Sequence, residues 1–154
     1  MGASEFEVTR DTTVDAPPQK VYELLADFRQ WRQWSPWEDI DPNLWRNYSG
    51  AASGVGAEYE WAGNRKAGAG RMEITDAEPP SRVVIALQFL KPFKSKSTTT
   101  FTVEPAASGT HVIWRMVGPK TFMTRFMGVF MSMDKMIGPD FEKGLAQLAD
   151  AARR

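Results

Sequence analysis

A tyrosine and a carboxylate near a tryptophan-rich turn are the residues best placed to transfer protons. Tyr59 lies in an alternating segment, which predicts an inward-facing side chain, and no other tyrosine is predicted on that face. Glu38 follows the turn Trp34-Ser35-Pro36-Trp37 directly, with Asp39 and Asp41 close behind it. A dry pocket shifts the pKa of such groups and makes acid–base catalysis feasible. The alternative is a set of solvated surface charges, which could pair with basic residues: Arg10, Arg65, Lys66, Arg71 and Arg115.

The composition excludes several other kinds of site. The chain has no cysteine, which rules out disulfides, thiolate catalysis, iron–sulfur clusters and cysteine-rich zinc sites. Its single histidine, His111, lies on the polar side of an alternating segment and is expected to face solvent. The glycines at 50, 54 and 56 do not match a phosphate-binding loop, because no Gly-Lys-Ser/Thr follows them. We therefore expect no metal and no cofactor.

The charge balance bears on the partners. Nineteen basic and nineteen acidic residues give a formal net charge of zero, which argues against nucleic acid. Lys91, Lys94 and Lys96 around Phe93 form only a faint nucleic-acid pattern. The first fifteen residues lack the apolar core of a signal peptide, and no apolar run is long enough to span a membrane. We expect a cytoplasmic protein without stable membrane insertion; the oligomeric state stays open.

The N-terminal third predicts one strand and two short helices. Residues 5–14 alternate as a half-buried strand, with Arg10 on the apolar side, either near an open end or paired with a carboxylate. Asp15 or Ala16 is expected to cap a helix whose first turn holds Pro17 and Pro18. Tryptophans then recur every third residue until Pro36 stops the helix. These tryptophans are equally consistent with a lid over a pocket and with packing of a small helix. They are Trp31, Trp34 and Trp37.

The remainder predicts a sheet followed by a long helix. Residues 45–118 alternate with short connections, which indicates six antiparallel strands. Apolar residues from Phe122 to Leu148 then recur at helical spacing, with a kink or break expected near Gly138-Pro139. A second stripe of methionines lies beside the first: Met123, Met127 and Met131.

These elements predict a single α+β domain over residues 1–154, in which about seven strands wrap around the C-terminal helix in the order β-α-α-β6-α. Trp114 and Phe130 are expected to face each other between the two layers. The inward aromatic and methionine side chains either fill a core or line a cavity that binds a ligand. The candidate ligand-binding residues are Trp37, Tyr59, Trp61, Met72, Phe89, Phe101, Trp114, Met116, Phe126, Phe130 and Met133.

Several short motifs carry a resemblance that covers about residues 5 to 152. They are Ala16-Pro17-Pro18-x-x-Val21, Trp34-Ser35-Pro36-Trp37-Glu38, Gly54-Val55-Gly56-Ala57, Trp61-x-Gly63-Asn64, Lys91-Pro92-Phe93 and the segment from Met133 to Leu145. With this layout the sequence resembles the SRPBCC superfamily, in particular its polyketide cyclase/dehydrase-like branch with the START-like helix-grip fold. The resemblance implies a cavity for a hydrophobic ligand between sheet and helix. It implies no universal catalytic residue.

Three functions follow as expectations. The first is binding of a small hydrophobic or amphipathic molecule, such as a lipid or a polyketide-like compound, in that cavity. The second is a polyketide cyclase/dehydrase-type enzyme, which a buried, partnered acid in the cavity would favour. The third is a protein-interaction module that uses the methionine stripe of the long helix.

Overall fold

The computed structural model describes residues 5–38, 40–91, 94–119 and 133–154, with only the backbone of Met133. The strands are β1 (Glu5–Val14), β2 (Trp45–Gly50), β3 (Ala57–Ala62), β4 (Ala69–Glu78), β5 (Arg82–Lys91), β6 (Ser95–Ala106) and β7 (Gly109–Pro119). The helices are α1 (Pro18–Ala26), the 3-10 helix η2 (Phe28–Gln33) and α3 (Met133–Arg153).

The seven strands form one antiparallel sheet in the order β1-β7-β6-β5-β4-β3-β2. Each strand from β2 to β7 pairs with the next strand along the chain, and β1 pairs with β7. Register shifts between β4 and β5, at Ala69/Gly70 and Ile74/Asp76, bend the sheet locally. The prediction of antiparallel strands over residues 45–118 is confirmed, as is the strand over residues 5–14.

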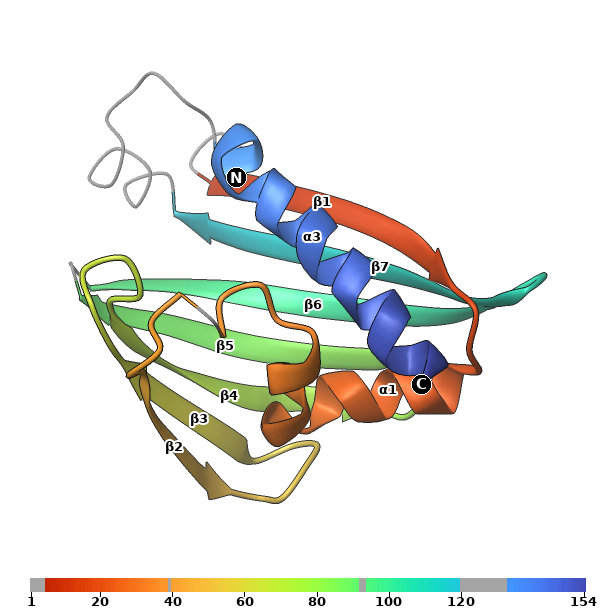
Figure 1. Ribbon diagram of the computed structural model, residues 1–154, viewed down its shortest axis with the longest axis horizontal. Coiled ribbons are helices and arrows are strands. Elements are labelled where there is room, and N and C mark those ends of the chain that lie inside the picture. Colours follow the sequence, from red (N-terminus) through yellow and green to blue (C-terminus); the bar gives the residue numbers. More distant parts are fainter. Residues whose placement is uncertain (1–4, 39, 92–93, 120–132) are drawn as a thin grey trace.

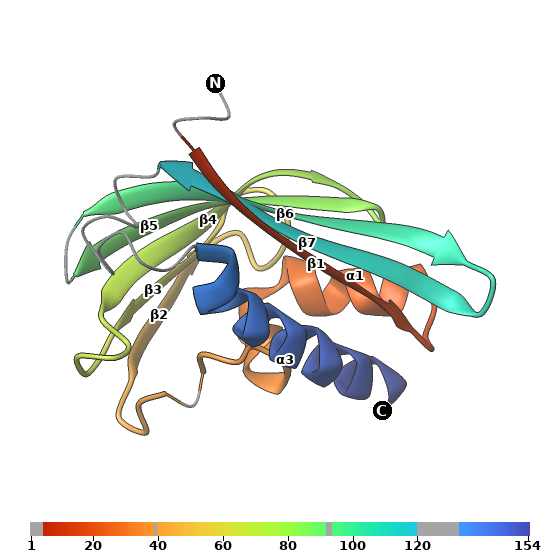
Figure 2. The same cartoon turned by 90° about the horizontal axis from the view of Figure 1, so that it is seen from above.

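The helices lie together on one face of the curved sheet, with α3 crossing the strands and α1 beside its C-terminal end (Figures 1 and 2). This arrangement confirms the α+β helix-grip fold. Within the described residues α3 continues through Pro139, so the predicted break is absent. The earlier part of the predicted helix, with the methionine stripe, lies outside the described residues. No described helix combines the length and the apolar character that crossing a membrane requires.

The two short helices follow from local sequence. Pro17 is the N-cap of α1 and Pro18 its first residue, so the helix begins slightly later than the predicted cap at Asp15 or Ala16. Asp27 caps η2 by accepting a hydrogen bond from the backbone N–H of Arg29 at 2.9 Å. η2 ends at Gln33, in agreement with the stop expected before Pro36.

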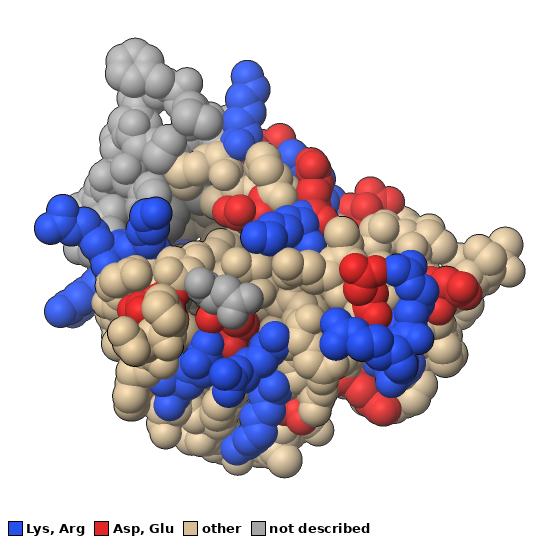
Figure 3. Space-filling view, viewed as in Figure 1, with Lys and Arg blue, Asp and Glu red and all other residues tan. Residues whose placement is uncertain are grey.

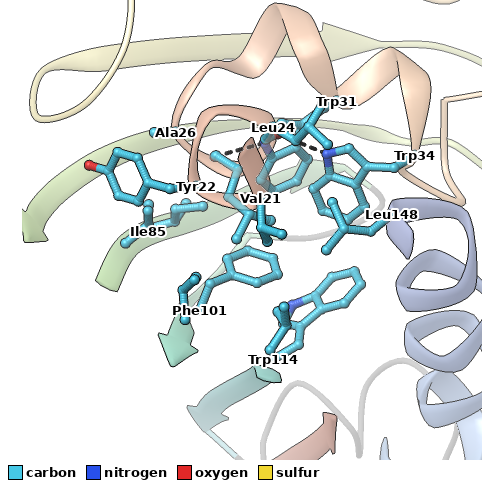
Figure 4. Packing of buried hydrophobic residues seen from close by; sticks show 14 of the residues in the cluster. Val21, Tyr22, Leu24, Ala26, Trp31, Trp34, Ile85, Phe101, Trp114 and Leu148 are labelled. Atoms are coloured by element: carbon cyan, nitrogen blue, oxygen red, sulfur yellow. Dashed lines mark hydrogen bonds between the residues drawn. The ribbon is translucent and has the colours of Figure 1, made fainter. Parts of the chain in front are cut away.

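Trp31 and Trp34 are buried core residues. Of the two alternatives for these side chains, packing is therefore the one observed. Their indole N–H groups donate to the carbonyl oxygens of Leu25 and Leu24, at 3.0 and 2.9 Å (Figure 4). Both rings also make edge contacts with Phe101 of β6. Each indole therefore buries a large apolar surface while its single donor stays satisfied.

Arg10 ties β1 to the start of α3. Its guanidinium donates to both carboxylate oxygens of Asp134, at 2.7 and 3.1 Å, and to Glu142 at 2.9 Å. Gly138 lies beneath this contact, since a Cβ there would come within 2.1 Å of an Arg10 nitrogen. Of the two alternatives for Arg10, pairing with a carboxylate is the one observed.

Candidate functional site

The helix-facing side of the sheet has two halves that differ in burial. Near α1 and η2 the inward residues are sealed from solvent, including Val83, Phe101 and Val112, each 0% exposed. Toward the β3–β4 and β5–β6 connections, the inward residues are only partly buried. We call this second region the open half; its half-buried members on the sheet are Trp61, Leu87, Phe89 and Ser97.

Strand register explains how the open half is built. Trp61 pairs with Gly70, and Gly70 pairs with Phe89, so both rings flank a position without a side chain. A Cβ on Gly70 would come within 2.5 Å of the Trp61 indole, which therefore lies across the glycine. The Trp61 and Phe89 rings meet edge to face at 5.6 Å. Small residues thus let large rings lie along the sheet instead of standing on it.

A buried carboxylate lies beside this aromatic surface. Glu38 is 7% exposed and accepts a hydrogen bond from the Tyr59 hydroxyl at 3.0 Å. Arg46 donates to the other carboxylate oxygen at 3.1 Å and to the Glu38 backbone carbonyl at 2.8 Å. Because both carboxylate oxygens have a donor, the cost of burying Glu38 is offset locally. We call Glu38, Arg46 and Tyr59 the acid cluster.

Two tyrosines stay protonated in this environment. Burial, reinforced by the nearby Glu38 carboxylate, raises the pKa of Tyr59 well above its ordinary value. Burial also raises the pKa of Tyr48, with Glu38 again contributing. The Tyr48 and Tyr59 rings lie 5.2 Å apart, and the Tyr48 hydroxyl is buried without a hydrogen-bond partner among the described residues. Both phenols are therefore hydrogen-bond donors at neutral pH. The Tyr48 hydroxyl has no acceptor among the described residues.

Three further buried polar atoms lack a partner in the described part of the chain. They are the Ser97 hydroxyl, the Trp114 indole N–H and the Nε of Arg82. Ser97 alternates with the inward residue Thr99 and belongs to the open half. Buried polar groups are nearly always satisfied by protein, water or a ligand, so these atoms mark places where one of them would bind.

The predicted ligand-binding residues divide between the two halves. Tyr59, Trp61, Met72 and Phe89 lie in the open half or at its border, where Met72 pairs with Tyr59 and with Leu87. The other described residues of the set are core residues or pack against the core: Trp37, Phe101, Trp114 and Met116. Phe126 and Phe130 lie outside the described residues, as does the side chain of Met133.

Sequence reasoning missed Arg46 and Tyr48. The prediction that Tyr59 is the only inward tyrosine is wrong, because Tyr48 pairs with Tyr59 and shares its face. Arg46 alternates with Tyr48 and reaches the same face, so the period of β2 carried the signal. The six strands expected over residues 45–118 include one at the place of β2, but its side chains were not assigned to a face.

Three of the basic residues considered as partners of these acids, Arg10, Arg71 and Arg115, pair with other carboxylates. Arg71 donates to Glu58 at 2.8 Å and Arg115 to Glu7 at 3.1 Å. Asp41 instead accepts from the backbone N–H groups of Asn43 and Asn64, at 2.8 and 2.7 Å. It therefore fixes the β3–β4 connection, while Asp39 lies outside the described residues.

His111 takes no part in the site. It projects from the outer side of the sheet, where its Nε2 lies 2.6 Å from Asp11 Oδ2. The same outer side has a half-open hollow of about 550 Å³, lined mainly by alternate residues of β4 to β7. None of the acid cluster lines it. Among the described residues, no three His, Asp or Glu side chains are grouped to hold a metal ion.

Solved structures of the same fold come from diverse proteins. A Rhizobium leguminosarum protein is 16% identical, with a TM-score of 0.72 over 97% of this chain and 95% of its own. The di-domain ARO/CYC BexL from the BE-7585A biosynthetic pathway is 14% identical, with a TM-score of 0.67. DynU16, from the dynemicin biosynthetic locus, is 20% identical, with a TM-score of 0.65.

The coverage of the last two comparisons is unequal. The match includes 97% of this chain but 50% of BexL, and 96% of this chain but 47% of DynU16, so this chain spans about half of each. No curated protein sequence matches the chain. The family described as "Polyketide cyclase / dehydrase and lipid transport" matches residues 5–153, nearly the whole sequence. Together with the sheet wrapped around α3, this match shows that the chain belongs to that polyketide cyclase/dehydrase and lipid-transport family.

Proposed function

We propose that the protein binds a small amphipathic molecule against the open half of the sheet, between β3–β6 and α3. The supporting observation is the contrast between the two halves of the same inner face. Inward apolar residues are sealed at one end, whereas Trp61, Leu87 and Phe89 keep solvent-accessible surface at the other. A ligand that covered them would gain about 25 cal/mol for each Å² of apolar surface removed from water.

The polar groups indicate that the ligand is amphipathic rather than purely hydrocarbon. The Tyr48 and Ser97 hydroxyls are buried and unpartnered among the described residues. Ligand pockets combine apolar walls with a few such groups, which orient the guest. A ligand with a flat apolar body and carbonyl or hydroxyl groups matches both features.

A cyclase/dehydrase-type enzyme is the second candidate, and the acid cluster favours it. A buried carboxylate beside a binding surface is the group that proton abstraction next to a carbonyl requires. Tyr59 would help to position the Glu38 carboxylate, because its raised pKa keeps the phenol protonated and its O–H donates to Glu38. Arg46 would hold the Glu38 carboxylate in place through its 3.1 Å contact. The family description includes both cyclase/dehydrase and lipid-transport members, so it supports either candidate.

Binding is tested by filling the open half. We would titrate wild type, Ser97→Phe and Thr98→Phe with a fluorescent fatty acid and with a fluorescent polycyclic aromatic probe. Ser97 faces inward, while the neighbouring Thr98 faces outward and is exposed, so the second variant is a matched control. We expect Ser97→Phe to weaken binding at least about tenfold and Thr98→Phe to leave it unchanged. Equal affinity in all three proteins, or none in wild type, would refute the site.

Catalysis is tested on the acid cluster. Wild type and Glu38→Gln would be incubated with a poly-β-carbonyl thioester, and the products separated by mass. The enzyme candidate requires turnover by wild type that Glu38→Gln abolishes while probe affinity stays within a few-fold. Binding without turnover in wild type would leave the binding function alone. Native mass spectrometry of protein purified from its own host would then identify the bound molecule.

A further inference from the structure

The connections at the open end of the sheet carry a cluster of basic side chains. Arg65 and Lys66 lie in the β3–β4 connection, and Lys91, Lys94 and Lys96 lie where β5 ends and β6 begins. Lys91 pairs with Ala69, the first residue of β4, so the two connections lie side by side. We call these five residues the basic rim. Blue side chains gather at this end, at the left of Figure 3.

The two sequence segments that carry the basic rim contain no acidic residue. Residues 61–70 and 86–98 contain all five cations and neither Asp nor Glu, so the other fourteen basic residues accompany all nineteen acidic ones. All five are exposed, and none forms an ion pair with a described residue. Several arginines elsewhere are paired, such as Arg71 with Glu58 and Arg82 with Asp76. A protein of zero net charge thus carries, at this end, five exposed cations without ion pairs to the described residues.

An exposed apolar side chain accompanies the cations. Leu90 is 40% exposed and lies between Phe89 of the open half and Lys91 of the basic rim. On the other connection, Trp61 of the open half precedes Arg65 by four residues. The basic rim therefore borders the surface proposed to take the ligand. Cations next to an exposed apolar residue are typical of protein surfaces that bind lipid headgroups.

We propose that the basic rim docks this protein on the anionic surface of a lipid bilayer, with the open half turned toward the lipid. Lys and Arg side chains near such a surface each contribute to binding, and the attraction fades within a Debye length of about 10 Å at 0.1 M salt. Leu90 would enter the headgroup layer. Nucleic acid has phosphates too, but an exposed leucine adds nothing to phosphate contacts, so the bilayer fits both features.

Docking is connected to the proposed function because the ligand would pass between the bilayer and the open half. Docking itself requires no ligand. The two proposals can therefore fail separately: probe affinity in the absence of vesicles tests the site, and vesicle binding in the absence of probe tests the basic rim.

The experiment is co-sedimentation with vesicles of phosphatidylcholine, with and without phosphatidylserine, at rising salt. We expect wild type to bind only the anionic vesicles and to dissociate as salt rises. R65E/K91E/K94E should lower the partition coefficient at least about tenfold, because three attractive charges become repulsive. K20E/K143E/R154E is the matched control, with the same charge change at exposed positions on α1, on α3 and at the C-terminal residue, and should bind like wild type.

Four results would overturn the proposal. They are no binding by wild type, equal binding to both vesicle types, equal losses in the two triple variants, and a rim-dependent mobility shift of DNA at sub-micromolar protein in place of vesicle binding. The last result would identify the phosphates of nucleic acid as the partner. The probe affinity of R65E/K91E/K94E without vesicles should equal that of wild type, which shows that the variant is folded.

Discussion

The rings of Trp114 and Phe141 stack face to face, with centroids 4.0 Å apart and planes 7° apart. Trp114 belongs to β7 and Phe141 to α3, so this contact joins the two layers of the fold. Trp34 and Trp37 approach the Trp114 ring edge-on, at 5.5 and 5.7 Å. Trp114 was expected to face Phe130, which lies outside the described residues; the partner observed for it on α3 is Phe141.

Phe141→Ala should destabilise the protein by about 3–5 kcal/mol, because it removes a fully buried ring and leaves a void between sheet and helix. The measurement is the free energy of unfolding from a denaturant titration. Phe89→Ala serves as the comparison: Phe89 is half-buried in the open half, so its loss should cost only about 1–2 kcal/mol. Similar losses in the two variants would show that the open half is packed as tightly as the core.

Tyrosine ionisation should coincide with alkaline unfolding. Burial raises the pKa of all three tyrosines, Tyr22, Tyr48 and Tyr59, in the folded state. A raised folded-state pKa stabilises the fold fully below the unfolded value of about 10, and this stabilisation is lost as pH rises through the folded value. Absorbance of tyrosinate near 295 nm should therefore appear together with loss of circular dichroism. Ionisation of a tyrosine near pH 10 with the fold intact would contradict the burial of its hydroxyl.

Glu38→Gln should cost about 3 kcal/mol, because it leaves the largely buried Arg46 without its counter-charge. Glu38→Leu combined with Arg46→Met should be less damaging than either change alone, since no unpaired charge is then buried. Tyr59→Phe should cost about 1.5–3 kcal/mol through loss of a hydrogen bond to a carboxylate. Denaturant titrations of the single and double variants give the coupling free energy between Glu38 and Arg46. If the changes in the free energy of unfolding were additive, the acid cluster would contribute no net interaction.

Gly138→Ala should have different consequences for stability in two backgrounds. Alanine in a helix interior normally stabilises by about 1 kcal/mol over glycine. Here its Cβ would displace the Arg10 guanidinium, which lies 2.1 Å from that position, and break the contact with Asp134. We expect little net change in the wild-type background and a gain of about 1 kcal/mol in Arg10→Met. Thermal unfolding of the four proteins checks this, and an equal gain in both backgrounds would contradict it.

The fold could be predicted from the sequence because its signals are local. Alternation in Glu5–Val14 and in residues 45–118 follows from having one buried face, and Pro36 ends η2 wherever the rest of the chain lies. Tyr59 and Glu38 could each be named as acid–base candidates from their local sequence, whereas the hydrogen bond between them is seen only in the structure.

The partners within the site were not predictable in the same way. Whether Phe101 lines a cavity or fills the core depends on Trp31 and Trp34, which pack on it from η2 and from the residue after it. Arg46 is not near Glu38 through any sequence motif; it arrives there because β2 pairs with β3 in one register. Such contacts depend on pairing across the sheet, which a single sequence does not specify.

The division of the inner face has a consequence for how this sequence can change. The residues that hold the layers together, such as Phe101, Trp114 and Phe141, are distinct from those in the open half, such as Trp61, Leu87 and Phe89. Mutations of the open-half residues therefore lower the free energy of unfolding less than mutations of the core residues do. Selection can replace the open-half residues one at a time while the layers of the fold stay joined.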